Sequence, residues 1–358
     1  MYSLSRTTLT EYLISQRRSH PGATGDFNAL VLQVATACKA ISRAMAHGAL
    51  GSVLGETEAA EGQGGSQTPM NVLADRIFHR AIHWSGSLSG MVSAHHEAPI
   101  ALPGGQQRGK YLLAFDPLDG AANLDVNLSV GSIFSILRAP EPGRDATTAD
   151  FLQAGCQQVA AGYALYGPAT MLVLSVGKGV AGFTFNPMMG EFFLTHPDIR
   201  VPPSTREFAI NASNSRFWEP PVKRYVEECL AGRSGVRGED FNMRWINSLV
   251  AETHRILSRG GVFLHPRDRK DPARPDQLRL IYECNPIGYL MEQAGGRAST
   301  GEYPVLEVAP EALHQRMGFV FGSAEEVARI ERYHSEPALA EKHLELPLFK
   351  TRGLFLDA

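Results

Sequence analysis

Lys110-Tyr-Leu-Leu-Ala-Phe-Asp116-Pro-Leu-Asp119-Gly120 is the most informative segment of this 358-residue chain. Its apolar part, Leu112–Phe115, predicts a β-strand, and two aspartates follow three residues apart. Asp125 comes six residues after the second of them. Carboxylates crowded to ~5 Å repel by about 3 kcal/mol at an effective dielectric constant of ~20. Such a cluster favours protons or a hard divalent cation, and magnesium or manganese suits oxygen ligands of this kind.

The residues that follow the aspartates are small. Gly120, Ala121 and Ala122 form a turn whose backbone N–H groups could hold a phosphate. A cation and a phosphate at one strand end indicate metal-assisted phosphoryl chemistry. The spacing alone also fits an ordinary tight turn, in which Asp caps its own backbone and Gly takes a positive φ. Both interpretations stay open at this level.

The overall composition indicates a globular protein that stays in the cytoplasm. Hydrophobic residues make up 44% and charged residues 20% of the chain, and the net charge is −3. This balance gives no electrostatic reason to expect nucleic acid or a membrane as partner. The first 18 residues lack a signal-peptide core, and no segment approaches the ~20 apolar residues of a membrane span. The wide spacing of the four cysteines predicts reduced, buried thiols.

The first part of the chain predicts helices followed by strands. Helical periodicity covers 26–48 and 71–84. Between them, 51–69 is rich in Gly, Ser and Glu and predicts a mobile loop. Short β-rich segments then predict strands at 112–115, 129–137, 159–165 and 171–176, and a hairpin from 182–186 and 191–195.

The Pro202-Pro203 pair is the best candidate for a domain boundary. We therefore predict an N-terminal α/β domain over 1–200, a C-terminal α/β substrate domain over 201–335 and a tail over 336–358. The second domain predicts helices at 220–230, 247–258 and 286–295, and strands at 261–264 and 278–282.

Several motifs along the chain identify a family. They are Phe115-Asp-Pro-Leu-Asp-Gly120, Leu124-Asp125, Ser129-Val-Gly-Ser-Ile-Phe134, Val159-Ala-Ala-Gly-Tyr-Ala-Leu-Tyr-Gly167, Thr170-Met-Leu-Val-Leu174, Gly260-Gly-Val-Phe-Leu264 and Leu278-Arg-Leu-Ile-Tyr-Glu-Cys-Asn-Pro286. Together they resemble class I fructose-1,6-bisphosphatase, within the metal-dependent, lithium-sensitive sugar and inositol phosphatases. The resemblance runs from about Thr8 to about Tyr333 in the family's order. Local variants at 157–159, 245 and 254–257 are similar to the proteobacterial type.

The resemblance implies two α/β domains in a layered helix–sheet sandwich, usually as a homotetramer. It implies hydrolysis of the 1-phosphate of fructose 1,6-bisphosphate to fructose 6-phosphate, in gluconeogenesis or the Calvin cycle, with Mg²⁺ or Mn²⁺ as cofactor. The family's AMP site is matched in part by Thr24-Gly25-Asp26, Lys110-Tyr111 and Arg138. Each of these is also a reasonable helix cap, strand edge or surface charge.

The resemblance also implies roles for single residues. The metal ligands would be Asp116, the Leu118 carbonyl, Asp119 and Glu283. The substrate-binding residues would be Asp119, Gly120, Ala121, Ala122, Asn211 and Arg244. Asp119 and Asp75 would act in catalysis, with Asp75 or Asp125 orienting water. The alternatives are an exposed strand-end acid for Glu283, and cap and surface roles for Asn211 and Arg244.

The metal and 1-phosphate positions depart from the family pattern. Two adjacent Glu are replaced by Ala94, which cannot ligate, and by His95, whose imidazole suits zinc or manganese. A surface histidine is the alternative for His95. A Ser-Ser pair is replaced by Ala121-Ala122, which removes hydroxyl donors. Two family acids become Asn71 and Arg76, and Asp75 would replace the second only if the helix start shifted by one position.

The 6-phosphate pocket departs as well. His265 and Gln277 stand for a Tyr and a Lys, and Asn247 replaces a Gly before Ser248. These changes leave two alternatives to the phosphatase. One is a catalytically impaired paralogue that binds sugar phosphates or co-assembles with an active homologue. The other is a phosphatase for sedoheptulose 1,7-bisphosphate or another sugar phosphate.

Overall fold

A computed structural model of the chain describes residues 6–18, 25–48, 68–273 and 275–336. Most of the predicted loop (51–67) and nearly all of the predicted tail (337–358) lie outside these residues, as does Thr24.

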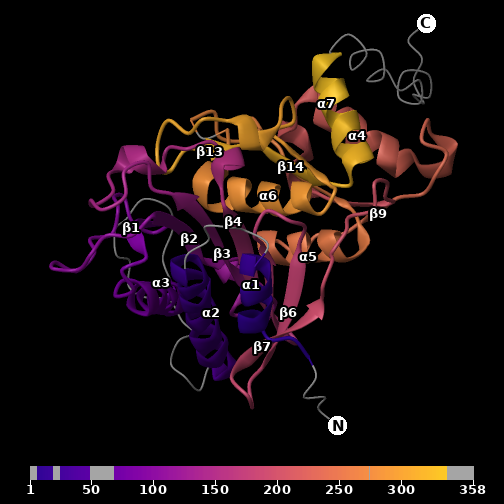
Figure 1. Ribbon diagram of the computed structural model, residues 1–358. Coiled ribbons are helices and arrows are strands. Elements are labelled where there is room, and N and C mark those ends of the chain that lie inside the picture. The colour runs from indigo at the N-terminus through magenta and orange to yellow at the C-terminus, as the bar shows by residue number, and fades with distance from the viewer. Residues whose placement is uncertain (1–5, 19–24, 49–67, 274, 337–358) are drawn as a thin grey trace, which may run out of the picture.

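Two sheets and three layers of helices alternate (Figure 1). The larger sheet has the strand order β1-β2-β3-β4-β5-β6-β7. Its strands are β1 Leu88–Ser93, β2 Tyr111–Asp119, β3 Val130–Arg138, β4 Ala160–Tyr166, β5 Thr170–Ser175, β6 Ala181–Asn186 and β7 Glu191–His196. Only β1 and β2 pair in parallel, so the carboxyl ends of these two strands meet at one edge. The expected layered α/β fold is confirmed, and the predicted hairpin is β6–β7.

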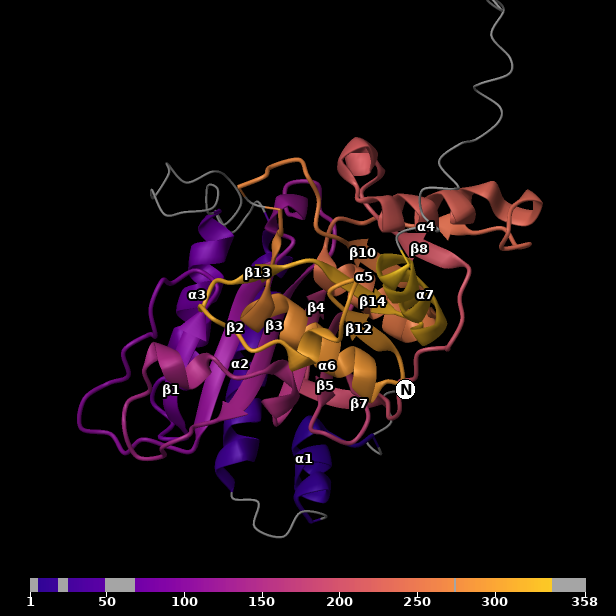
Figure 2. The same cartoon turned by 90° about the horizontal axis from the view of Figure 1, so that it is seen from above.

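Helices on the two faces of this sheet have different partners (Figure 2). One face is covered by α1 Leu9–Arg18, α2 Gly25–Ala46 and α3 Pro69–Ile82. On the other face, α5 Leu249–Arg259 and α6 Asn285–Gln293 lie between the larger sheet and the smaller one. Apolar side chains of both sheets and of α5 and α6 share one buried cluster.

The smaller sheet has the order β12-β14-β10-β8-β9. Its strands are β12 Arg297–Ser299, β14 Phe319–Gly322, β10 Val262–His265, β8 Glu207–Ala209 and β9 Asn242–Met243. Beyond it pack α4 Pro220–Ala231 and α7 Ala324–Ser335, and β11 Leu278–Arg279 pairs with β13 Arg316–Met317. The short 3₁₀ turns are η2 Ala121–Asn123, η3 Thr148–Phe151, η4 Gly155–Gln157, η5 Ala212–Phe217, η6 Gly232–Ser234 and η8 Val305–Glu307.

Helix α2 corrects one expectation about apolar segments. With 22 residues and a mean hydropathy of 1.2 in its most apolar window, it is long and apolar enough to cross a membrane by these two criteria. In the structure, however, 39% of that window is buried, and residues such as Leu30, Val34 and Ile41 belong to the core under the larger sheet. The buried positions therefore account for part of its apolar composition.

The four cysteines are free thiols, as expected. Cys38, Cys229 and Cys284 are buried, but Cys156 in η4 is exposed, so the expectation of burial is wrong for this residue.

Helix α3 is fixed against β2 by two aromatic rings. Phe78 stacks on Phe115 with ring centroids 4.8 Å apart and planes 11° from parallel, and both side chains are fully buried. Because residues three apart share a helix face, Asp75 lies on the same side of α3 as Phe78. The packing of α3 therefore directs Asp75 toward the sheet edge where β1 and β2 end.

Strand β2 does not end at Phe115, where the sequence predicts a turn. It continues to Asp119 through a bulge, because Asp116 pairs with Ile133 whereas Asp119 pairs with Gly131. Successive side chains of a regular strand alternate between faces, which would send residues three apart to opposite faces. The extra residue in the bulge cancels one alternation and lets both aspartates serve one site. Only Gly120, with φ +75°, begins the turn.

Residues 278–284 also differ from the predicted strand. Only Leu278–Arg279 is extended, and Leu280–Cys284 forms one wide π-helical turn that leads into α6. The Glu283 side chain accepts a hydrogen bond from the Arg279 backbone N–H (2.5 Å), which closes this turn. Glu283 is consequently buried rather than an exposed strand-end acid.

Gly131 of β3 allows α5 to pack closely on the larger sheet. A Cβ atom at this position would lie 2.5 Å from the Ala164 carbonyl oxygen and 2.5 Å from Cγ1 of Val250. We expect Gly131→Ala to lower the free energy of unfolding by about 1–3 kcal/mol, because backbone or helix must shift. Urea denaturation followed by circular dichroism measures this loss. Gly104→Ala, at a position with nothing within 4 Å, is the matched control. Equal stability of the two variants would contradict the prediction.

Candidate active site

Three buried carboxylates lie close together at the carboxyl end of β2. Asp116, Asp119 and Glu283 are 5%, 9% and 7% exposed. Burial, and next to it the negative charge of Asp116, raises the pKa of Asp119 to about 7 and that of Glu283 to about 8. Raised values of this kind mark negative charge that the surrounding protein does not neutralise. The structure therefore brings together the three acidic side chains that the sequence indicated as metal ligands.

Hydrogen bonds hold each of these carboxylates in place. Oδ1 of Asp116 accepts from the Leu118 backbone N–H at 3.1 Å. Oδ2 of Asp119 accepts from the Ser248 hydroxyl at 3.1 Å and from the Val250 backbone N–H at 2.9 Å. The last two donors belong to the start of α5, so Asp119 connects the larger sheet to that helix.

The turn after Asp119 is pressed against the same helix start. A Cβ atom at Gly120 would lie 2.9 Å from the Ser248 side chain. The amide nitrogen of Asn123 donates to the Ile246 and Asn247 carbonyl oxygens, both at 3.3 Å. Gly120, Ala121 and Ala122 thus form a fixed turn, and the first N–H groups of such a turn have no intrahelical acceptor.

Asp75 reaches this edge from α3. The helix begins at Pro69, and the Thr68 side chain caps it by accepting from the Asn71 N–H. The Ser93 hydroxyl donates to Oδ1 of Asp75 at 2.5 Å, and Nε2 of His96 lies 2.7 Å from Oδ2. Arg76 is exposed.

His95 is not the surface histidine that the sequence allowed. It is only partly exposed, and its Nδ1 atom is buried with no hydrogen-bond partner. Burial lowers the pKa of His95, against the opposing effect of Asp116 and Asp75. The ring is therefore close enough to Asp116 of β2 and Asp75 of α3 for both charges to act on it.

Three other candidate residues make no hydrogen bond or ion pair to the three acids within the part of the chain that the structure describes. Oδ1 of Asn211 accepts from the N–H and the hydroxyl of Ser213 at 3.1 and 2.6 Å, so its side chain caps η5. The Arg244 side chain is 52% exposed and pairs with Glu207 at 3.3 Å. Asp125 is exposed in the loop after η2.

The residues in place of the family's Tyr, Lys and Gly have local roles. His265 ends β10 with its ring centroid 6.2 Å from that of Phe263, and burial lowers its pKa. The Gln277 carbonyl oxygen accepts from the Arg316 guanidinium. Asn247 has a left-handed backbone (φ +58°), a conformation that Asn tolerates better than most residues do.

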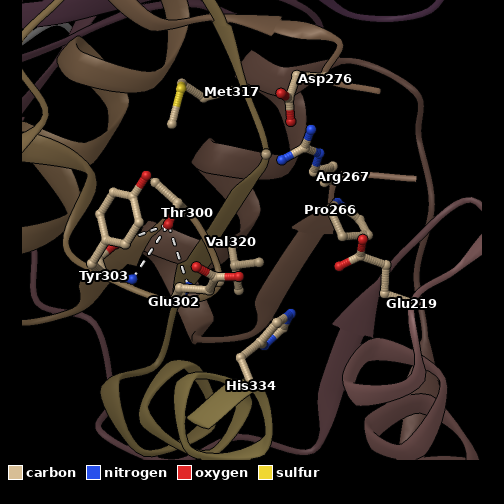
Figure 3. A pocket seen from close by; sticks show the side chains of 12 residues that line it. Glu219, Pro266, Arg267, Asp276, Thr300, Glu302, Tyr303, Met317, Val320 and His334 are labelled. Atoms are coloured by element: carbon tan, nitrogen blue, oxygen red, sulfur yellow. Dashed lines mark hydrogen bonds between the residues drawn. The ribbon is translucent and has the colours of Figure 1, made fainter. Parts of the chain in front are cut away.

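Two hollows elsewhere contain none of the three carboxylates. The pocket in Figure 3, of about 80 Å³, is lined by charges of both signs, with Arg267 beside Asp276. A larger hollow of about 490 Å³ lies between the end of α2 and the β4–β5 hairpin, with Met70, Leu128 and Tyr166 in its lining. Neither hollow contains buried acids of raised pKa next to a tight turn like that at Gly120. The carboxylate cluster is therefore the candidate active site.

The donor set of the cluster fits a hard divalent cation. Among the described residues, no group of three or more His, Cys, Asp or Glu side chains is placed to hold a metal ion by itself. Magnesium usually keeps several waters and binds through one or two carboxylates plus substrate phosphates, so an open site of this kind suits it. The buried, uncompensated negative charge of Asp119 and Glu283 is the observation that supports the fit.

Sequence reasoning missed the residues that support these acids. Ser248 precedes α5 and caps it by accepting from the Ala251 N–H, a signal visible in the sequence, but its bond to Asp119 spans 129 positions. Ser93 and His96 hold Asp75 across shorter separations of 18 and 21 positions. No local pattern announces such contacts, because they depend on how β1, α3 and α5 pack.

Comparisons with known proteins cover nearly the whole chain. Residues 7–197 match the family model described as fructose-1-6-bisphosphatase, N-terminal domain, and residues 201–335 match that of the C-terminal domain. A fructose-1,6-bisphosphatase class 1 from Hydrogenophilus thermoluteolus is 63% identical over 98% of this chain and 97% of its own length. A second such protein, from Methylibium petroleiphilum, is 60% identical over 99% of this chain and 98% of its own length.

A solved structure agrees with these sequence matches. The crystal structure of Leishmania major fructose-1,6-bisphosphatase in holo form superimposes with a TM-score of 0.85 at 36% identity. The match covers 92% of this chain and 99% of that chain.

Proposed function

This chain belongs to the class 1 fructose-1,6-bisphosphatase family and is a phosphoric monoester hydrolase. We therefore propose that it hydrolyses a phosphate ester at the cluster of Asp116, Asp119 and Glu283. The substrate is fructose 1,6-bisphosphate, and the 1-phosphate is removed. The observation that supports this location of the active site is the buried group of Asp116, Asp119 and Glu283 beside the Gly120 turn.

The family is metal-dependent, and we propose Mg²⁺ or Mn²⁺ as the cofactor. Asp116, Asp119 and Glu283 would hold it with their side chains and Leu118 with its carbonyl oxygen. When bound, a divalent cation neutralises phosphate oxygens and lowers the pKa of water. The protein contributes fixed carboxylate positions, since each of the three acids already accepts a hydrogen bond from a backbone N–H.

The 1-phosphate would lie on the turn of Gly120, Ala121 and Ala122, next to Asp119. The two alanines offer backbone N–H groups but no hydroxyl donors. Each missing hydrogen bond to a charged group costs roughly 1.5–3 kcal/mol of binding. Binding at this turn therefore depends on its rigidity, to which the bonds of Asn123 to the 246–247 backbone contribute.

Asp75 is the candidate for orienting water. Its carboxylate is held by Ser93 and His96, and its side chain is only 13% exposed. A carboxylate fixed in this way can accept a proton from water without first reorganising. We give Asp119 a catalytic role as well, because it belongs to the carboxylate cluster and directly precedes the turn of Gly120, Ala121 and Ala122.

The 6-phosphate would be bound by Asn211 and Arg244. The exposed guanidinium of Arg244 follows the short edge strand β9, whose Met243 is 47% exposed. This position supports a homotetramer in which Arg244 reaches the site of a neighbouring copy. The predicted substrate domain of residues 201–335 contains both residues.

An AMP site is the regulatory part of the proposal. Tyr111 and Arg138 are direct partners across β2 and β3, and the guanidinium lies 6.0 Å from the Tyr111 ring centroid. Phe27 of α2 packs on the same ring at 5.8 Å. Lys110 and Asp26 flank this group. The Tyr111 ring itself is buried, so the exposed charges of Lys110 and Arg138 are the feature that supports a nucleotide site.

We place the enzyme in the cytoplasm, without nucleic acid or membrane partners.

Phosphate release by the purified protein tests the function. We expect release from fructose 1,6-bisphosphate that depends on millimolar Mg²⁺ or Mn²⁺ and stops with a chelator. Sedoheptulose 1,7-bisphosphate and fructose 6-phosphate should give lower kcat/KM values. Absence of metal-dependent release from every sugar phosphate would contradict the proposal. A higher kcat/KM for sedoheptulose 1,7-bisphosphate would correct the substrate and leave the reaction class unchanged.

A further inference from the structure

Nδ1 of His95 is a buried ring nitrogen that has no hydrogen-bond partner in the described part of the chain. A neutral imidazole carries one N–H donor and one nitrogen acceptor, and a buried polar atom without a partner costs about 1–3 kcal/mol. An unpaired ring nitrogen in an otherwise well-bonded region therefore indicates a ligand that completes it.

The backbone around His95 directs the ring into the candidate active site. Ser93 and Phe115 are partners in the parallel pairing of β1 and β2, and the Ala94 N–H donates to the Phe115 carbonyl at 3.0 Å. His95, two residues after the end of β1, therefore follows that strand next to the part of β2 that contains Asp116. The His95 backbone N–H donates at 3.2 Å to the Ser93 hydroxyl, which itself donates to Asp75.

We propose that Nδ1 of His95 supplies a nitrogen ligand to a divalent cation held next to Asp116. This inference rests on the proposed function, since the cation belongs to the same hydrolytic site. Imidazole is a better ligand for transition-metal ions, above all zinc, iron, nickel and copper, than for magnesium, which prefers oxygen ligands. The nitrogen ligand therefore raises the affinity of this position for transition-metal ions, Mn²⁺ included, relative to magnesium.

The structure contains one competing pair of ring nitrogens. His79 of α3 and His83, the residue that follows this helix, lie four positions apart with ring centroids 5.0 Å apart. Nε2 of His79 is buried without a partner, and Nδ1 of His83 contacts the His79 carbonyl oxygen. Two histidines with this spacing can chelate a metal on one helix face, so the experiment must separate them from His95.

Pulsed electron paramagnetic resonance on the Mn²⁺-loaded full-length protein separates them. Nitrogen coupled to bound Mn²⁺ should be detected in the unaltered chain and in His83→Gln, and should be lost in His95→Gln. Absence of coupled nitrogen in the unaltered chain, its persistence in His95→Gln, or its loss in His83→Gln would each overturn the proposal. Circular dichroism of each variant shows that its fold is kept.

Metal affinity gives a second, independent measurement. Loss of outer contacts to metal ligands costs 10–100-fold in affinity, so loss of a direct ligand in His95→Gln should weaken Mn²⁺ binding at least about tenfold. His95→Glu restores an oxygen ligand and should shift the Mn²⁺-to-Mg²⁺ affinity ratio toward Mg²⁺. Isothermal titration calorimetry measures both, and an unchanged ratio in both variants would overturn the proposal.

The two proposals fail in different ways. Phosphate release with no nitrogen coupled to Mn²⁺ would leave the phosphatase function intact and remove His95 as a ligand. Coupled nitrogen that disappears in His95→Gln, without phosphate release from any sugar phosphate, would establish the ligand and remove the function.

Discussion

Replacing Asp119 by Asn should reduce kcat for fructose 1,6-bisphosphate by about a thousandfold or more. The substitution removes a negative charge that would bind the cation next to the phosphate, and ~4 kcal/mol of lost transition-state stabilisation corresponds to a factor of about 10³. Asn keeps an oxygen that can accept from the Ser248 hydroxyl and the Val250 N–H, so the contact with α5 stays. Steady-state phosphate release at saturating metal and substrate measures the effect.

A matched control separates charge at the site from charge in general. Asp198→Asn makes the same change at a side chain that is 59% exposed and pairs with Arg200 at the surface. We expect its kcat to equal that of the unaltered chain within a factor of two or so, since exposed ion pairs contribute little. If Asp119→Asn retained more than a tenth of the kcat of the unaltered chain, the proposed role of Asp119 in metal binding and catalysis would be wrong.

The largest expected loss of stability comes from Glu326→Ala. Glu326 and Arg237 form an ion pair at 2.5 Å, with side chains only 5% and 7% exposed. The other Glu326 oxygen accepts from the Tyr225 hydroxyl at 2.6 Å. Removing one member of a buried pair leaves the other charge without a partner, which typically costs 3–5 kcal/mol. Guanidinium denaturation should show a loss of about that size.

The adjacent residue provides the control for this experiment. Glu325 lies in the same first turn of α7 but is exposed, so Glu325→Ala should change the free energy of unfolding by about 0.5 kcal/mol or less. Glu326→Gln should fall between the two, because it keeps a hydrogen-bond acceptor for Tyr225 and loses the charge. A Glu326→Ala variant as stable as Glu325→Ala would show that the pair is not a stabilising element.

Much of the fold could be predicted because its signals are local. The helical period between 71 and 84 and the β-rich run before Asp116 each correspond to an element within a few residues. The bulge in β2 could not be predicted, since it exists only in the pairing of Asp116 and Asp119 with β3. The π-helical turn at Leu280–Cys284 likewise depends on a hydrogen bond that the Glu283 side chain accepts from the Arg279 backbone N–H. The β-rich composition of this segment favoured a strand instead.

The site shows the same division. Asp116 and Asp119 could be identified from the sequence because they lie close together in one segment. Glu283 could be linked to them only through the family resemblance, and the structure brings it next to Asp116. The surroundings of His95 were beyond either approach, because they are formed by the ends of two parallel strands and one helix face.

The bonds from Asp119 to the start of α5 have a consequence for control of turnover. One oxygen of this carboxylate already receives two donors from a helix that packs against the smaller sheet. Any displacement of α5 must therefore reposition Asp119 or break those bonds. The position of this helix and the geometry of the carboxylate cluster are thus coupled through a single acidic side chain.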